Sequence, residues 1–231
     1  MFYFALLLTP ERDLNPAEGA AEMAAYQEFH AKAASAIRGG DALAAAGDGK
    51  LITGWPGEPV VTDGPFAEGA EVAGGYYVFE ADNLDDALEL ARQIPAAQYG
   101  AIEVWPMVHW NAPSQPVGAD WLALLLESPD EVNIPGSPEF EARVAQHVEV
   151  HQSIGDHILG GAPLHPPATA TTVRVRDGQT VLTDGPYVEG AEVANGFYLL
   201  RAADRDEAVK LASMIPAGSV AVRRLAGIAG L

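Results

Sequence analysis

The sequence contains no cysteine, which excludes several classes of protein at once. Without thiols the chain cannot form disulfides, bind zinc through Cys, or use a Cys nucleophile, and a disulfide-stapled secreted scaffold is not expected. Long hydrophobic runs are also missing, because the apolar stretch from Phe2 to Leu8 is far short of the ~20 residues that span a bilayer. No basic segment precedes that stretch, so a signal peptide is not expected either.

Positive charge is scarce: 13 Lys and Arg residues stand against 32 Asp and Glu residues, a net charge of −19 over 231 residues. Nucleic-acid surfaces need clustered positive charge, so a nucleic-acid partner is not expected. Phosphate-binding Gly loops and the G-x-S-x-G and H-E-x-x-H motifs are absent, which removes the main support for nucleotide-dependent or triad-hydrolase activity. With 48% hydrophobic residues, the composition predicts a globular, cytoplasmic protein without a membrane partner.

An internal repeat determines the expected organisation. Residues 60–95 and 181–216 are identical at 20 of 36 positions without a gap, at an offset of 121. At the same offset His30 aligns with His151, whereas the apolar runs at 5–8 and 123–126 align at an offset of 118. The sequence therefore predicts two domains, residues 1–110 and 120–231, joined by a Pro-containing linker at 111–119.

In the second copy, apolar spacing of three and four residues predicts a helix over 138–158, stopped by Gly160-Gly161. A second helix is expected from Asp204 or Asp206 to Ile215. Asp177-Gly178 is typical of a hairpin turn, and the first copy is expected to have lost this hairpin because its sequence differs there. Strands are expected over 121–126, 171–176, 179–183, 197–201 and 220–225.

This order of elements predicts an α+β fold in which helices cover one face of an antiparallel sheet, as in ferredoxin-like units. One such sheet leaves an apolar face and open edges that invite pairing with another copy. The two fused copies are therefore expected to form an intramolecular pseudo-dimer.

The repeated motif Thr-Asp-Gly-Pro-Phe/Tyr-x-Glu, the Gly/Asn-Gly-Phe/Tyr strand and the helix ending in Ile-Pro resemble the YCII-related, or DGPF-domain, family. The resemblance covers nearly the whole chain, twice. It implies the dimeric α/β-barrel fold, in which two ferredoxin-like units pack sheet to sheet. The family's biochemical role is largely undefined, although a His/Asp pair has been suggested as an active site in some members.

Two His/Asp pairs are candidate catalytic groups. Asp63 and Asp184 precede Gly-Pro, where Asp is typical of a turn but can also orient a histidine. His30 and His151 occupy equivalent positions on the expected first helix of each copy, where a packed or surface role is the alternative. We hypothesise that Asp63 with His30, and Asp184 with His151, face shared pockets.

Other polar residues are candidates for ligand contacts. His147 and His151 lie four residues apart and would form a metal site if Asp184 or Glu189 supplied a third ligand, although the first copy has Tyr26 in place of His147. Arg174 and Arg176 would either anchor an anionic ligand or form salt pairs with the acidic surface. The remaining candidate ligand-binding residues are Glu68 and Glu189, which would cap a turn or line the mouth of a pocket.

Together these observations predict a small-molecule-binding protein with His/Asp acid–base chemistry of isomerase or lyase type and no cofactor. A non-catalytic module that binds a ligand or another protein is the alternative, and a metal-dependent enzyme using His147 and His151 is the third. The chain is expected to act as a monomer or a homodimer. The second half is less acidic and alone contains Arg174, Arg176 and His147, so if only one pocket works it is expected there.

Overall fold

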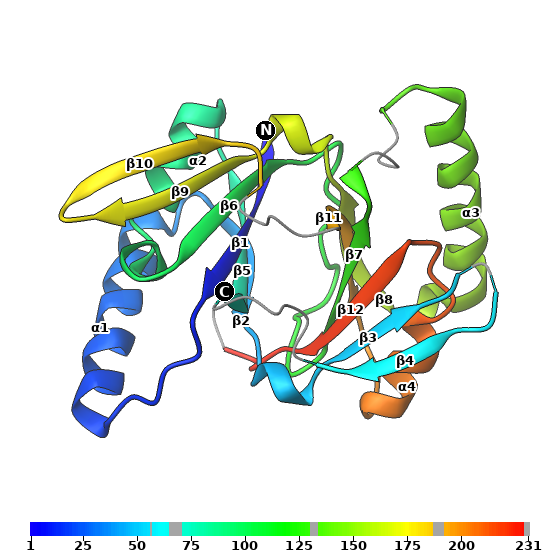
Figure 1. Ribbon diagram of the computed structural model, residues 1–231, viewed down its shortest axis with the longest axis horizontal. Coiled ribbons are helices and arrows are strands. Elements are labelled where there is room, and N and C mark those ends of the chain that lie inside the picture. The colour runs from blue at the N-terminus through cyan, green and yellow to red at the C-terminus, as the bar shows by residue number, and fades with distance from the viewer. Residues whose placement is uncertain (56, 65–70, 130–133, 187–191, 229–231) are drawn as a thin grey trace.

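The computed structural model describes residues 1–231 except 56, 65–70, 130–133, 187–191 and 229–231. Each repeat runs strand, helix, strand, hairpin, strand, helix, strand (Figure 1). The first repeat contains β1 (Phe2–Thr9), α1 (Pro16–Ala33), β2 (Ile37–Ala42), β3 (Lys50–Thr53), β4 (Val60–Asp63), β5 (Val72–Glu80), α2 (Leu84–Ala91) and β6 (Ala101–Pro106). The second contains β7 (Trp121–Glu127), α3 (Pro138–Ile154), β8 (Ile158–Pro163), β9 (Thr171–Arg176), β10 (Gln179–Asp184), β11 (Val193–Leu200), α4 (Arg205–Ala212) and β12 (Ser219–Arg224). Short 3-10 turns include η1 (Ala46–Asp48) and η2 (Pro95–Gln98).

The strands form two six-stranded antiparallel sheets. Sheet 1 has the order β10-β9-β6-β1-β5-β2, and sheet 2 has the order β4-β3-β12-β7-β11-β8. In each, the last four strands follow the ferredoxin-like order, with helices covering one face. The expected α+β class and ferredoxin-like units are therefore confirmed.

The hairpins are exchanged between the two repeats. The hairpin β9–β10 of the second repeat joins sheet 1, where Val173 pairs with Ile102 of β6. The hairpin β3–β4 of the first repeat joins sheet 2, where Ile52 pairs with Val220 of β12. Each sheet is thus completed by two strands from the other repeat, so the repeats in sequence are not separate bodies in space.

Several sequence-based expectations need correction. The strands β2 and β8 were not expected, because their Gly-rich sequences lack apolar alternation. Gly160-Gly161 lies inside β8 and does not end a helix. Glycine is needed there because a Cβ on Gly161 would come within 2.4 Å of the Phe197 carbonyl oxygen on β11. The helix α3 ends at Ile154, four residues before the expected end at 158. The first copy keeps its hairpin, as β3–β4, despite the divergent sequence.

Local sequence explains where the helices begin. Asn15 caps α1 in a capping box with Glu18, and Pro16 occupies the first turn. Ser137 and Asp204 cap α3 and α4 through their side chains, so the earlier of the two expected starts for α4 is confirmed.

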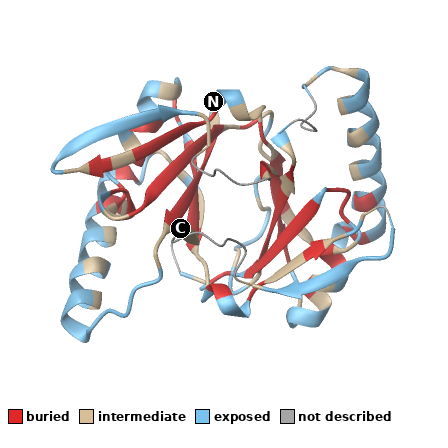
Figure 2. Ribbon diagram, in the orientation of Figure 1, coloured by how far each residue is buried: buried red, intermediate tan, exposed pale blue. Residues whose placement is uncertain are grey.

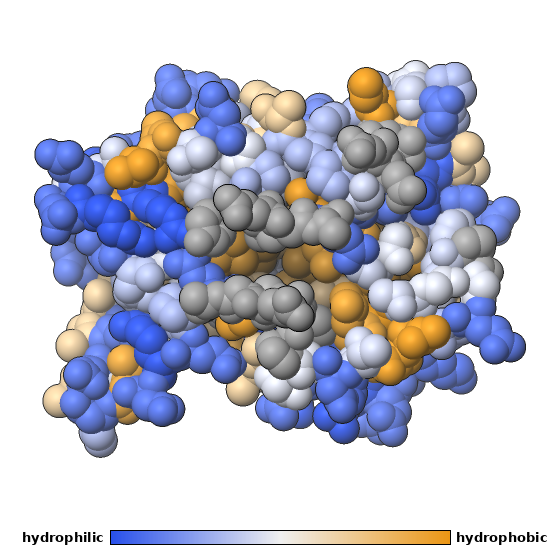
Figure 3. Space-filling view, viewed as in Figure 1, coloured by the Kyte–Doolittle hydropathy of each residue, from blue (hydrophilic) through white to orange (hydrophobic). Residues whose placement is uncertain are grey.

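Hydrophobic side chains form three layers of core, and the buried residues follow the strands while the outer helix faces are exposed (Figure 2). One layer lies between the two sheets, where the rings of Phe4 and Phe197 stack with centroids 4.4 Å apart. The other two lie under α1 and α2 and under α3 and α4. Hydrophobic residues show between the sheets in the space-filling view, and hydrophilic ones cover much of the rim (Figure 3).

The two sheets also meet through their backbones. Leu43, after β2, forms an antiparallel bridge with Leu225, after β12, and Met107 does the same with Leu164. No helix in the described part of the chain is long and apolar enough to cross a membrane.

Candidate functional site

A cavity of about 530 Å³ lies between α1 and sheet 1 in the first half. Helix α1 contributes Tyr26 and His30 to its wall, and the sheet contributes Asp41 and Tyr77. Ile228, which follows the last strand of the second repeat, completes the wall, so the cavity belongs to both repeats. Its volume lies within the ~300–1,000 Å³ that small-molecule sites occupy.

His30 and Tyr77 form the central polar contact of this cavity. The His30 Nε2 and Tyr77 Oη atoms are 2.6 Å apart. Burial lowers the pKa of His30, which favours the neutral imidazole near pH 7. Burial raises the pKa of Tyr77, and the nearby Tyr26 and Asp41 raise it further, so the phenol keeps its proton. A protonated phenol can donate to Nε2 of a neutral imidazole whose ring proton is on Nδ1.

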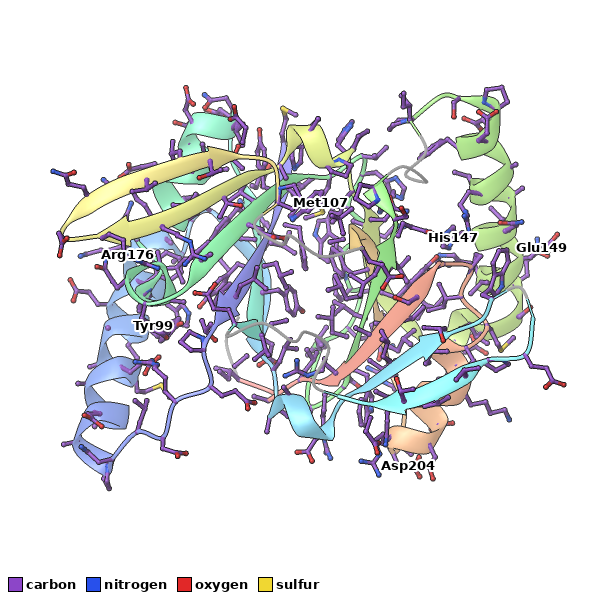
Figure 4. All side chains as sticks on the ribbon, viewed as in Figure 1. Tyr99, Met107, His147, Glu149, Arg176 and Asp204 are labelled. Atoms are coloured by element: carbon purple, nitrogen blue, oxygen red, sulfur yellow. The ribbon has the colours of Figure 1, made fainter. Side chains whose placement is uncertain are left out.

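The mouth of the cavity carries an ion pair held on an aromatic ring. The Arg12 guanidinium lies 3.5 Å from the centroid of the Tyr99 ring and 2.6 Å from a Glu22 carboxylate oxygen. The Tyr99 hydroxyl donates to the other oxygen of the same carboxylate. Figure 4 shows Tyr99 beside α1. The charges of Arg12 and Glu22 therefore compensate each other.

Asp41 is a buried carboxylate on β2, with 5% of its surface exposed. Its oxygens accept hydrogen bonds from the backbone N–H groups of Gly227 (3.0 Å) and Ile228 (3.2 Å). Burial raises the pKa of Asp41, although these hydrogen bonds oppose the effect. A carboxylate of the first repeat thus holds the segment of the second repeat that closes the cavity.

The expected His/Asp pairs do not form, because hairpin exchange moves each Asp to the other sheet. Asp63 lies on β4 in sheet 2, where it is exposed and forms an ion pair with Lys50 that lowers its pKa, while His30 lies over sheet 1. Asp184 is exposed at the end of β10 in sheet 1, while His151 is on α3 over sheet 2. The partner of His30 is Tyr77 instead.

The equivalent region of the second half has different chemistry. His147 Nδ1 lies 2.9 Å from the hydroxyl of Tyr198, and the His151 ring is 5.6 Å from the Tyr198 ring. Figure 4 shows His147 on the side of α3 that faces the sheet, with Glu149 on the opposite side. Among the described residues, no group of three or more His, Asp or Glu side chains could hold a metal ion. The described residues therefore supply no third ligand to His147 and His151, and Glu189, one of the two ligands expected for this metal site, lies outside them.

Residues that line the cavity in the first half are replaced at the equivalent positions of the second repeat. At the offset of 121, Gly19 aligns with Phe140, Asp41 with Ala162, and Tyr26 with His147. A Cβ built on Gly19, which lines the cavity, meets nothing within 4 Å. The expectation that the second half holds the single working pocket is therefore not supported by the geometry.

Arg174 and Arg176 are engaged within the protein, and these contacts do not favour the candidate role of ligand anchor. Arg174 forms two hydrogen bonds of 2.9 and 3.0 Å with the carboxylate of Glu71, in the other repeat, and a third with the Gly100 carbonyl oxygen. Arg176 donates to carbonyl oxygens at the end of η2 and of Gly100. Both side chains fasten the exchanged hairpin to the first repeat. The alternative, salt pairing, is correct for Arg174.

Of the other candidates, Tyr26 lines the cavity as a ligand-contacting residue should, whereas Glu68 and Glu189 lie outside the described residues. Sequence reasoning missed Asp41, Tyr77 and Tyr99. Tyr77 lies on strand β5, and aromatic residues on strands usually pack in the core. The sequence signal that points to Tyr77 is its alignment with Tyr198. In the structure the hydroxyl of each tyrosine lies within hydrogen-bond distance of a histidine.

We expect His147 to make stability depend on pH. Burial lowers its pKa to about 4, and Arg143 and His151 act in the same direction. Between that value and the ordinary 6.5, the unfolded chain binds more protons than the folded one, so stability is present above pH 6.5 and lost as the pH falls toward 4. We expect the free energy of unfolding, measured with urea, to fall between pH 6.5 and pH 4 by about 1–2 kcal/mol less in His147→Gln than in wild type. Equal pH dependence, or an imidazole resonance titrating near its ordinary pKa, would contradict this.

Comparison with known proteins identifies the repeated unit. Both halves match the model of the YCII-related domain, over residues 1–111 and 121–226. A stretch of 53 residues is 43% identical to an uncharacterised protein of Rhizobium meliloti (strain 1021), covering 22% of this chain and 43% of that protein, which is less than half its length. A solved structure named "Putative Chlorite dismutase" is similar with a TM-score of 0.46 and 9% identity, over 97% of this chain and 93% of the other. The family match spans nearly the whole chain, which therefore belongs to the YCII-related family as two tandem copies of its domain.

Proposed function

We propose that the chain binds an organic small molecule in the cavity under α1 and transfers a proton there. The observation that carries this proposal is the 2.6 Å contact between His30 and Tyr77 on the wall of a 530 Å³ cavity. A general base needs to be unprotonated at the working pH and within hydrogen-bond reach of the proton it accepts. The lowered pKa of His30 meets the first condition.

The two side chains act together in this proposal. The Tyr77 oxygen takes a proton from the ligand while its own proton passes to Nε2 of His30, leaving a neutral phenol and an imidazolium. The return of both protons along the same path restores the starting state, so the step suits an isomerase or lyase.

A variant that fills the cavity tests the proposal. We expect Gly19→Phe, which copies Phe140 of the second repeat, to remove ligand binding without loss of stability, because Gly is a poor helix former. A fragment library should contain compounds that raise the Tm of wild type and fail to raise that of Gly19→Phe. Gly47→Phe is the matched control, since Gly47 is also open but lies in η1, and it should respond as wild type does. Equal shifts in wild type and Gly19→Phe would refute the proposal.

We also infer that the two sheets close into one barrel, the finer form of the fold that the sequence suggests. The bridges Leu43–Leu225 and Met107–Leu164 support this, since they join β2 to β12 and β6 to the end of β8. Backbone hydrogen bonds continue beyond each bridge, as from Ala226 to Ala42 and from His165 to Pro106. In such a barrel the exchanged hairpins branch outward and leave α1 and its cavity on the outer face of sheet 1.

A further inference from the structure

The charges around the cavity do not balance. Its charged lining residues are Arg12, Glu22 and Asp41. Arg12 and Glu22 form an ion pair at 2.6 Å, and the lowered pKa of His30 keeps that ring neutral. Within the described part of the chain, no Lys, Arg or His nitrogen lies within 4 Å of the Asp41 carboxylate. One buried negative charge therefore remains at the wall of the cavity.

The hydrogen bonds to Asp41 leave room for a further donor. Its two oxygens accept the backbone N–H groups of Gly227 and Ile228, and the N–H of Ala42 also acts on this carboxylate. A carboxylate has about four acceptor positions, so one remains for a further donor. A buried carboxylate is costly unless a positive charge or several donors compensate it. A ligand ammonium group would supply both a charge and N–H donors at this point.

The remaining walls suit the body of such a ligand. Tyr26 and Tyr77 present aromatic rings, and Leu14, Met23 and Ile228 present aliphatic surface. Aromatic faces attract cations, and the Tyr99 ring at the mouth already holds the Arg12 guanidinium at 3.5 Å. The net charge of −19 also attracts cations and repels anions at longer range.

We propose that the ligand of this cavity is an organic amine, whose ammonium group pairs with Asp41 and whose apolar body packs against the tyrosine rings and Ile228. This inference rests on the proposed function of the same cavity and names its ligand class. It also explains the segment after β12: Ile228 closes the cavity, and Asp41 binds the backbone beside it. The second repeat has Ala162 in place of Asp41 and lacks this carboxylate.

Three probes of similar size test the charge preference on wild type alone. Benzylamine, benzyl alcohol and benzoate differ in charge but share a ring, and each is titrated to about 10 mM at fixed ionic strength. We expect benzylamine to bind at least about tenfold more tightly than benzyl alcohol, and benzoate to bind most weakly. Binding of benzyl alcohol or benzoate as tight as that of benzylamine overturns the amine inference and leaves the cavity's proposed function standing. Failure of all three probes overturns both.

Two variants locate the effect. Asp41→Asn should weaken benzylamine binding about tenfold and leave benzyl alcohol within about twofold of wild type. Asp63→Asn removes the same charge from exposed strand β4 and should leave both affinities within about twofold. Unchanged benzylamine affinity in Asp41→Asn, or an equal loss in Asp63→Asn, overturns the proposal. If Asp41→Asn shows no cooperative thermal transition, the three-probe comparison on wild type decides.

Discussion

Separated from each other, residues 1–114 and 115–231 should each fail to give a folded monomer. Each fragment would lack the hairpin that completes its sheet and would expose the apolar face that packs between the sheets. The expected loss is comparable to the whole free energy of unfolding, about 5–15 kcal/mol for a typical domain. Circular dichroism and sedimentation of the purified fragments measure it.

The same experiment contains its control. A protease site inserted between the exposed residues Ser114 and Gln115 should allow cleavage without dissociation, because the exchanged hairpins hold the halves together. Mixing the separately purified fragments should restore the fold. A monomeric fragment that unfolds cooperatively by itself would show that the exchange is not needed for folding.

Replacement of Arg174 by Ala should lower the free energy of unfolding by about 2–3 kcal/mol, the second large effect. The guanidinium forms a bidentate pair with Glu71, and both side chains are largely buried, at 19% and 13% exposure. Its removal leaves the Glu71 carboxylate in a poorly solvated position and loses the bond to Gly100. Urea unfolding at pH 7 measures the change.

An exposed ion pair provides the comparison. Arg38 and Glu80 form a pair at 39% and 46% exposure, so Arg38→Ala should cost less than about 1 kcal/mol. Combining Arg174→Ala with Glu71→Gln should cost less than the sum of the two single changes, since neither charge is then left unpaired. If Arg174→Ala unfolds within about 0.5 kcal/mol of wild type, the pair does not fasten the hairpin.

Much of the fold is predictable from the sequence because the repeat is so clear. The helix start at Asp204 and the hairpin around Asp177-Gly178 follow from capping and turn chemistry. The strands β2 and β8 do not, because their glycines are selected by close approach to β5 and β11 and leave no apolar alternation. Hairpin exchange is equally hidden, since pairing with either sheet places the same residues in a strand.

The site was only half predictable for the same reason. Aligned histidines drew attention to His30, which lines the cavity, as does Tyr26, one turn earlier on α1. The pairing of His30 with Asp63 assumed that each hairpin stays with its own repeat, and the exchange removes that assumption. Asp41 stands beside two glycines in an unexpected strand, and no local pattern marks it as buried.

The most direct test of the proposed site is an NMR titration of wild type with a fragment that raises its Tm, followed through the imidazole resonances of all six histidines. The cavity lies against His30, whereas His147 and His151 face Tyr198 in the other half. We predict that the His30 resonances shift on binding and that those of His147 and His151 do not. Shifts at His147 or His151 with His30 unmoved would contradict the assignment of the functional pocket to the first half.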